Sequence, residues 1–344
     1  MKAFLLHGAK DLRNVDLPKP VPGPGEVLLA MHRAGICGSD IHYFNHGQIG
    51  SLVPKRAFVL GHEFAGEIVE VGEGVPHTRV GERVTVDPSI PCAHCGFCRG
   101  GRYNLCPNMR FFGSASCDPH INGGFEEFIL APAANALAVP DALSWGEAAM
   151  AEPLSVAVHA ARRAGNLAGQ AVLVTGGGAI GQLAALVARV FGAGRVVLSD
   201  IRAGPRQFAL DRGVDGVLDA QSPDFAIEAE ALAPGGFDVV IEAAGSSAAL
   251  AQALSVVRRG GTIVQVGTLP ATVTLPLNTL MARELTLLGS FRFANVFPSA
   301  IALMASGRID VRPLITSVYP LAELGTAMHT AIHATDGVKV QISA

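Results

Sequence analysis

Two groups of cysteine, histidine and glutamate residues have the types and spacing of metal ligands. The segment CAHCGFCRGGRYNLC, residues 92–106, contains four cysteines in the pattern C-x2-C-x2-C-x7-C. Four thiolates so close together are typical of a closed tetrahedral Zn²⁺ site with no position for a substrate, so we expect a structural zinc. The alternatives are unrelated buried cysteines and an iron–sulfur cluster, whose bacterial pattern has a shorter spacing before its final Cys-Pro pair. The expected ligands are Cys92, Cys95, Cys98 and Cys106.

The second group combines a soft, a borderline and a hard ligand. Cys37 lies in GICGSDIH, residues 35–42, and His62 and Glu63 lie in LGHEFAG, residues 60–66. Mixed ligands with an open position are typical of a catalytic metal rather than a structural one. The alternative is a packed thiol and a capped or exposed histidine. The sequence therefore predicts two zinc ions per chain, one catalytic and one structural.

A glycine-rich turn in the second half has the pattern of a dinucleotide site. The apolar segment 171–175 is followed by G-x-G-x-x-G, with Gly176, Gly178 and Gly181, and then by a helical pattern. The first glycine permits a tight turn, the second lets backbone N–H groups approach a pyrophosphate, and the third lets the helix pack close to the strand. The helix N-terminus would face the phosphates. The alternative is a tight strand–helix turn that binds no ligand.

The next expected strand ends in Asp200, 19 positions after Gly181. A carboxylate there accepts hydrogen bonds from the adenosine ribose and repels a 2′-phosphate, which favours NAD. Arg202 and Arg206 follow closely, and either one could meet the phosphate of NADP, which is therefore the alternative cofactor. The remaining residues expected to bind the cofactor are Ile180, Val266 and Gly267.

Length, composition and charge exclude several classes of protein. The chain has 344 residues, 49% hydrophobic and 16% charged, which is too apolar for disorder and long enough for two domains. A net charge of −3 disfavours binding to nucleic acid or an anionic membrane. We see no uninterrupted apolar run of membrane-spanning length and no signal-peptide pattern. We therefore expect a cytoplasmic protein whose six cysteines form no disulfides.

The expected secondary structure changes near residue 144, from short strands to alternating helices and strands. Before it, short strand patterns at 26–34, 63–72 and 82–88 lie between glycine and proline turns. The spacing at 144–165 predicts a helix, after which apolar strands alternate with helices. This alternation indicates an α/β fold with a doubly wound parallel sheet.

These patterns also predict the domain organisation. We expect a β-rich domain at 1–153, with a zinc-binding lobe at about 87–124 that is otherwise long for an irregular loop. A dinucleotide-binding domain follows at 154–290, and residues 291–344 return to the first domain.

The order of the motifs is shared with a known family. GICGSDIH, GHEFAGEIVEVG, the four-cysteine segment, AEPLSVAVHA and the glycine-rich turn extend over almost the full chain. This order resembles the zinc-dependent medium-chain dehydrogenases, which include alcohol, sorbitol and threonine dehydrogenases. The resemblance implies a GroES-like catalytic domain, a Rossmann domain with the active site in the cleft between them, and a homodimer or homotetramer. It also implies hydride transfer between a secondary alcohol and NAD(P), with zinc polarising the substrate oxygen.

Individual residues match positions of the polyol branch of this family. The resemblance implies that the mixed-ligand group binds the catalytic zinc and that Glu152 lies beside the metal. Asp40 matches a residue that supports the metal site. Ser39 and His42 match a proton relay that passes through the nicotinamide ribose.

The expected substrate contacts come from the same resemblance. Tyr43, Arg292 and Phe293 match positions that line the polyol pocket, although sorbitol dehydrogenases tend to carry Tyr at the last position. The segments RFFGSASCDPHINGGF, SVAVHAA and LLGSFRF resemble the L-idonate 5-dehydrogenases, a sugar-acid group. An arginine fork would grip the carboxylate of an aldonate, which makes Arg110 and Arg292 the candidates.

We therefore expect a dehydrogenase of a polyol or an aldonate, with oxidation of L-idonate to 5-ketogluconate as the favoured reaction. The alternatives within enzymes are sorbitol, xylitol and threonine dehydrogenases. The alternative outside enzymes is a catalytically silent nucleotide-binding protein, which would be expected to lose Cys37, His62 or the relay residues.

Overall fold

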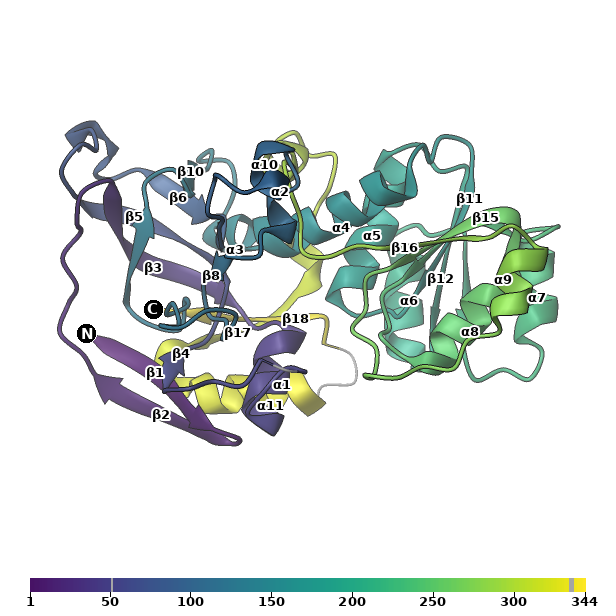
Figure 1. The fold of residues 1–344 in the computed structure, drawn as a ribbon, viewed down its shortest axis with the longest axis horizontal. Helices are drawn as coiled ribbons and strands as arrows, with labels where there is room; N and C mark the ends of the chain where they lie inside the picture. The colour runs from purple at the N-terminus through teal and green to yellow at the C-terminus, as the bar shows by residue number, and fades with distance from the viewer. Residues whose placement is uncertain (51, 334–336) are drawn as a thin grey trace. The chain divides into compact units, whose positions relative to one another are not determined.

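The structure is a computed structural model that describes residues 1–50, 52–333 and 337–344. It consists of two compact units (Figure 1). The first comprises Met1–Glu152 and Phe297–Ala344, and the second comprises Pro153–Val296. Within the described ranges, no helix has both the length and the apolar character needed to cross a membrane.

The first unit is built on antiparallel strands, with β3 (Glu26–Gly35) at the centre of its largest sheet. The order in that sheet is β10-β6-β5-β3-β18-β17, and β9 also pairs with β3. The pairing of β3 with β5 (Glu63–Val71) places Gly35 opposite Glu63. On the other side of β3, β18 (Lys339–Ser343) brings the C-terminal segment against the residues that precede Cys37.

The remaining elements of the first unit are short strands, helices and single turns. In chain order they are β1 (Lys2–Gly8), β2 (Asp11–Asp16), α1 (Gly38–His46), β4 (Phe58–Val59), η1 (His77–Arg79), β6 (Arg83–Val86), β7 (Ser89–Ile90), α2 (Gly96–Arg99), η2 (Tyr103–Leu105), β8 (Arg110–Phe111), β9 (Phe128–Pro132), β10 (Ala136–Ala138), α3 (Trp145–Ala149), α10 (Phe297–Ala305), η3 (Arg312–Leu314), β17 (Ile315–Pro320), η4 (Leu321–Glu323) and α11 (Leu324–His333).

The second unit contains a parallel sheet in the order β13-β12-β11-β14-β15-β16. This is the doubly wound arrangement predicted from the alternation of apolar strands and helices. Helices α5 and α6 lie on one side of the sheet and α7 and α8 on the other (Figure 1). The elements are α4 (Ala151–Ala164, which starts at the unit boundary), β11 (Ala171–Thr175), α5 (Ala179–Val190), β12 (Arg195–Asp200), α6 (Ala203–Asp211), β13 (Gly216–Asp219), α7 (Phe225–Leu232), β14 (Phe237–Glu242), α8 (Ser247–Val256), β15 (Val257–Gln265), α9 (Leu277–Ala282) and β16 (Thr286–Gly289).

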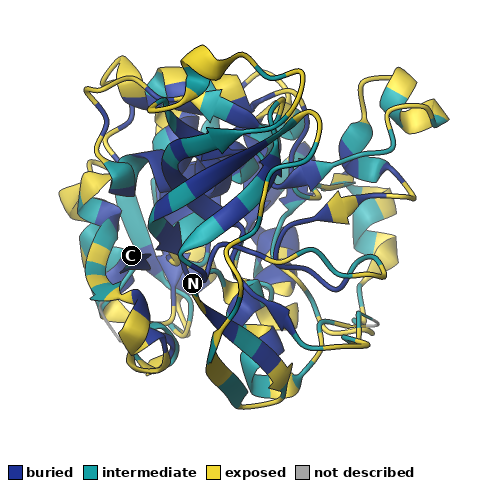
Figure 2. Ribbon diagram, turned by 90° about the vertical axis from the view of Figure 1, so that its left-hand side faces the viewer, coloured by how far each residue is buried: buried dark blue, intermediate teal, exposed yellow. Residues whose placement is uncertain are grey.

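Each unit has its own hydrophobic core. In the first unit, side chains such as Leu29, Phe64 and Ile342 join the sheet to the helices and strands around it. Figure 2 shows buried strands at the centre of this unit, with exposed residues mainly in loops and on outward helix faces. In the second unit, Leu173 and Val240 on neighbouring strands are fully buried, as expected for a parallel sheet covered by helices.

The single helix expected at 144–165 is wrong in one respect. The segment forms two helices, α3 and α4, which are separated at Met150. Pro153 explains the break, because its ring would clash with the carbonyl of Ala149 if one helix ran through both segments. In the observed arrangement Pro153 lies in the first turn of α4, where its missing N–H costs no helical hydrogen bond.

Candidate active site

Cys37, His62 and Glu63 are brought together by the pairing of β3 with β5. Their ligand atoms all lie within 4.8 Å of one another. Cys37 follows β3 at the N-terminus of α1, and the other two residues lie at the start of β5. Gly35 is required at its position, because a Cβ there would lie 2.0 Å from the Glu63 Oε2 atom. This sulfur, nitrogen and oxygen set matches the donors that Zn²⁺ accepts at a catalytic site.

The His62 ring is buried beside acidic groups. Its Nδ1 lies 3.7 Å from Oδ1 of Asp40, which is fully buried. Asp40 also accepts hydrogen bonds from the N–H of Cys37 at 2.9 Å and of Gly61 at 3.1 Å. Burial lowers the pKa of His62, but attraction by Asp40 and Cys37 outweighs it and raises the pKa to about 10. A metal ion binding to this ring would therefore displace a proton.

Glu63 is paired with a lysine that the sequence pattern did not single out. Lys339 donates from Nζ to both carboxylate oxygens of Glu63, at 2.7 and 2.6 Å, and to the carbonyl of Ile36 at 3.2 Å. Burial lowers the pKa of Lys339, but the attraction of Glu63 outweighs it, so the pKa is raised. The sequence offered one signal for a buried lysine. Lys339 begins the short segment KVQIS, whose apolar residues Val340 and Ile342 predict a buried strand.

Glu152 acts electrostatically on His62, but it is not one of the three residues whose ligand atoms lie together. The side chain is 5% exposed in the first turn of α4. Burial raises its pKa to about 8, against the attraction of His62. The His62 ring also lies 5.7 Å from the buried ring of Phe111, which forms part of the wall around the set.

The four cysteines of the lobe also converge. The sulfur atoms of Cys92, Cys95, Cys98 and Cys106 lie within 4.8 Å of one another. Hydrogen bonding from the backbone at His94 lowers the pKa of Cys92, which favours its thiolate form, whereas burial raises the pKa of Cys98 in the same set. His94, which lies between Cys92 and Cys95 in the sequence, is exposed and is not part of the four-cysteine set.

The two expected relay residues lie on α1, three positions apart. Ser39 is half-buried next to Cys37, and His42 is exposed. Residues three apart share a helix face, so Ser39 and His42 lie on one side of α1. The ring of His46, one turn further on, lies 5.7 Å from that of His42.

The glycine-rich turn has the geometry of a nucleotide site. Gly176 has φ of +87°, and a Cβ on Gly181 would lie 1.7 Å from the Gly176 carbonyl oxygen. Gly178 is the N-cap of α5, and a Cβ there would meet no described atom within 4 Å. The space over the first turn of α5, where Ile180 lies half-buried, is therefore open to a phosphate group.

Asp200 ends β12 and is already tied to the turn. It accepts hydrogen bonds from the N–H of Gly177 at 2.7 Å and of Arg202 at 2.8 Å. Arg206 donates to the carbonyl of Asp200 at 2.8 Å and pairs with Asp219 at 2.9 Å. Arg206 is thus held by two acceptors, whereas the Arg202 side chain is 43% exposed, with its Nε 3.5 Å from Oδ1 of Asp200.

Val266 and Gly267 lie after β15 at the same edge of the sheet. Both backbone N–H groups donate to the carbonyl of Glu242 at 2.9 Å. The buried carboxylate of Glu242 accepts hydrogen bonds from the N–H of Ala244 and of Gly245, so this one residue fixes two of the loops that follow the strands.

The expected substrate residues are divided between the units. In the first unit Arg110 is exposed, and Tyr43 is buried with its hydroxyl accepting a hydrogen bond from the N–H of Ala115 at 3.0 Å. In the second unit Phe293 is fully buried, and Arg292 has φ of +49° with its guanidinium 5.0 Å from the centre of the Phe291 ring. Their contact with substrate stays a prediction.

Comparison with known proteins places these features in one family. The model for the alcohol dehydrogenase GroES-like domain matches residues 23–141, and that for zinc-binding dehydrogenase matches residues 179–306. The chain is 38% identical to sorbitol dehydrogenase of Gallus gallus over 99% of this chain and 95% of the relative.

Two solved structures are similar over their whole length. L-idonate 5-dehydrogenase of Escherichia coli has a TM-score of 0.91 and 34% identity, covering 100% of this chain and 98% of that one. A putative zinc-binding dehydrogenase of Sinorhizobium meliloti bound to NADP has a TM-score of 0.91 and 35% identity, covering 100% and 99%.

Proposed function

The chain belongs to the zinc-dependent medium-chain dehydrogenases of the sorbitol dehydrogenase type, and we propose that it oxidises L-idonate to 5-ketogluconate with NAD as the preferred acceptor. It is an NAD(P)-dependent zinc enzyme that acts on the CH–OH group of an alcohol or polyol.

One observation carries the catalytic assignment. The donor atoms of Cys37, His62 and Glu63 lie within 4.8 Å of one another, while the four cysteines form a separate closed set. We assign the first set to catalytic zinc and the second to structural zinc. Zinc in the first set would supply a Lewis acid that lowers the pKa of the substrate hydroxyl. NAD(P) would supply the acceptor for the hydride from the carbinol carbon.

The chain's own residues would handle the proton. Ser39 is half-buried beside Cys37, and His42 is exposed on the same face of α1. We assign Ser39 to proton transfer near the substrate hydroxyl and His42 to proton release into solvent. Glu152, whose pKa is raised by burial, is assigned to the water side of the metal set.

The choice of L-idonate rests on its carboxylate. A guanidinium pairs with a carboxylate through two parallel charge-assisted hydrogen bonds, and Arg110 and Arg292 lie in segments similar to the idonate enzymes. The 34% identity to the Escherichia coli enzyme supports this assignment. Sorbitol is the second candidate, because the sorbitol dehydrogenase of Gallus gallus is 38% identical.

Initial-rate kinetics on L-idonate, gluconate, sorbitol, xylitol and threonine, each with NAD and NADP, test the proposal. We expect the highest kcat/KM for L-idonate with NAD. Arg110→Met or Arg292→Met should lower kcat/KM for L-idonate at least about tenfold and that for sorbitol much less, since a charged hydrogen bond contributes about 1.5–3 kcal/mol. A higher kcat/KM for sorbitol than for L-idonate in the unmodified enzyme would contradict the aldonate proposal. Equal losses of kcat/KM on both substrates in the arginine variants would also contradict it. In either case the enzyme would still be a polyol dehydrogenase.

We further assign the enzyme to the cytoplasm as a homodimer or homotetramer. All six cysteines are free, which fits a reducing compartment. Size-exclusion chromatography with light scattering measures the oligomeric state directly.

A further inference from the structure

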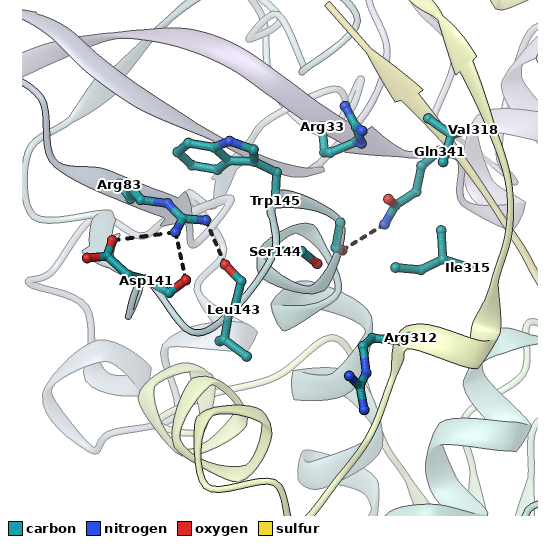
Figure 3. A pocket seen from close by; sticks show the side chains of 11 residues that line it. Arg33, Arg83, Asp141, Leu143, Ser144, Trp145, Arg312, Ile315, Val318 and Gln341 are labelled. Carbon is teal, nitrogen blue, oxygen red and sulfur yellow. Dashed lines mark hydrogen bonds and ion pairs between the residues drawn. The ribbon is translucent and has the colours of Figure 1, made fainter.

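The first unit contains a pocket of about 480 Å³ (Figure 3). It shares no lining residue with either metal set or with the nucleotide turn. Its walls come from β3, β6, α3, β17, β18 and the loops beside them. Three of the lining residues are the arginines Arg33, Arg83 and Arg312, and the acidic residue among the described lining is Asp141.

Arg33 contributes an uncompensated positive charge. Its Nη1 donates to the carbonyl of the preceding residue, His32, at 2.8 Å. In the described part of the chain, no carboxylate oxygen forms an ion pair with it within 4.0 Å. A backbone carbonyl satisfies one donor but does not neutralise the charge, so most of the guanidinium remains available to an anion.

Arg83 is held in place by the Trp145 ring and by backbone carbonyls. Its guanidinium lies 4.3 Å from the centre of the Trp145 ring and donates to the carbonyls of Asp141 at 3.1 Å and Leu143 at 2.6 Å. The Asp141 carboxylate lies 3.5 Å away but is 96% exposed, so solvent screens this pair. Figure 3 shows Arg83 beneath the indole, with dashed lines to Asp141 and Leu143.

The third arginine adds little net charge, because Arg312 forms two hydrogen bonds of 2.8 Å with Asp310.

The positive charges of Arg33 and Arg83 act on a neighbouring histidine, His32. The ring of His32 stacks on Trp145 at 4.3 Å, and burial lowers its pKa. Repulsion from Arg33 and Arg83 lowers it further, against the attraction of Glu67.

We propose that this pocket binds a compact oxyanion, a carboxylate or a phosphate, at a site separate from the active site. Guanidinium groups suit such ligands because their planar fork matches two oxygens at once. Trp145 lines the pocket between the stacked ring of His32 and the guanidinium of Arg83, and the volume falls within the range of about 300–1,000 Å³ typical of small-molecule sites. The proposal does not depend on the substrate proposed above.

The sequence provides a direct probe of this pocket, because Trp145 is the single tryptophan of the chain. We would titrate the zinc-loaded protein with citrate and, separately, with inorganic phosphate, at constant ionic strength made up with chloride. We expect a saturable change in tryptophan fluorescence with at least one of them. Tighter binding of citrate would indicate a carboxylate ligand, and tighter binding of phosphate a phosphate ester. The absence of saturable binding of both would overturn the proposal.

Matched variants locate the binding. Arg33→Met should weaken the anion at least about tenfold and Arg33→Glu should abolish saturation, because a charged hydrogen bond is lost or reversed. Arg13→Met is the control, since Arg13 is an exposed arginine of the same unit that pairs with Asp11 at 2.6 Å. Cys37→Ser should bind the anion as tightly as the unmodified protein, which separates this pocket from the metal set. Unchanged affinity in Arg33→Met, or loss of binding in Cys37→Ser, would contradict the assignment.

Discussion

The ammonium group of Lys339 lies 2.7 and 2.6 Å from the two carboxylate oxygens of Glu63, and both side chains are almost completely buried. The two residues are 276 positions apart, so this contact also ties the C-terminal strand to the metal set. A carboxylate has about four lone-pair positions, and two hydrogen bonds leave others for a metal ion. Lys339 therefore orients Glu63 and balances its charge without excluding it as a ligand.

Lys339→Met should destabilise the protein by about 3–5 kcal/mol, because it leaves a buried carboxylate without its partner. Chemical denaturation measures this loss. The double variant Glu63→Gln with Lys339→Met should lose less than the single variant, since no buried charge remains unpaired. Lys339→Arg, which retains the charge, should recover part of the stability. Additive losses in the double variant would show that the two residues are not coupled.

The two cysteine substitutions should separate the metal sets. Cys98→Ser should remove one zinc per chain and lower the melting temperature, because structural zinc is coupled to folding. Cys37→Ser should remove the other zinc and nearly all turnover while preserving the fold. Zinc analysis of purified protein, thermal melting and initial rates provide the three measurements. Full turnover in Cys37→Ser would contradict the assignment of the catalytic set.

The metal ligands were accessible from sequence because their residue types and spacing are specific. Four cysteines within fifteen residues predict a cluster whatever the surrounding fold, and the structure groups their sulfur atoms. The parallel sheet was also predictable, because strands such as 171–175 are continuously apolar. Lys339 and the arginine pocket were not, since each depends on pairing between distant strands. The break at Met150 could also be predicted, because Pro153 interrupts the helical pattern although the spacing of apolar residues continues through it.

Replacement of His42 tests the proton path. His42→Ala should lower kcat at least about tenfold at neutral and lower pH, where hydroxide cannot replace the lost acceptor. Small exogenous bases such as imidazole should restore part of the rate. The matched control is His46→Ala, which removes an exposed histidine one turn along α1. An unchanged pH–rate profile in His42→Ala would show that the ring takes no part in proton transfer.

The preference for NAD is tested at Asp200. Asp200→Ala should raise KM for NAD about tenfold, through loss of hydrogen bonds to the ribose, and should lower KM for NADP by removing repulsion of the 2′-phosphate. Asp200→Asn is the control for loop structure, because it retains an oxygen that can accept from the Gly177 N–H. A strong preference of the unmodified enzyme for NADP would contradict this proposal and would indicate that Arg202 binds the 2′-phosphate.

Glu126 makes the stability of the first unit depend on pH. The residue is 4% exposed, and its Oε2 atom has no hydrogen-bond partner among the described residues. Burial raises its pKa from 4.5 to about 8. Below pH 4.5 the carboxyl is protonated in both folded and unfolded chains, so it contributes no difference. Between pH 4.5 and 8 only the unfolded chain releases the proton, so the free energy of unfolding falls as pH rises and becomes constant above pH 8.

Glu126→Gln removes this titration and should therefore be more stable than the unmodified protein at alkaline pH. One pKa unit corresponds to about 1.4 kcal/mol, and we expect a gain of about 2–4 kcal/mol at pH 9, on the order of the full shift. The gain should shrink steadily towards pH 5, as measured by urea denaturation at each pH. Glu127→Gln is the control, since that neighbouring carboxylate accepts a hydrogen bond from the N–H of Lys2 at 2.7 Å near the surface. A gain for Glu126→Gln that is the same at pH 5 and pH 9 would mean that packing, and not ionisation, sets the difference.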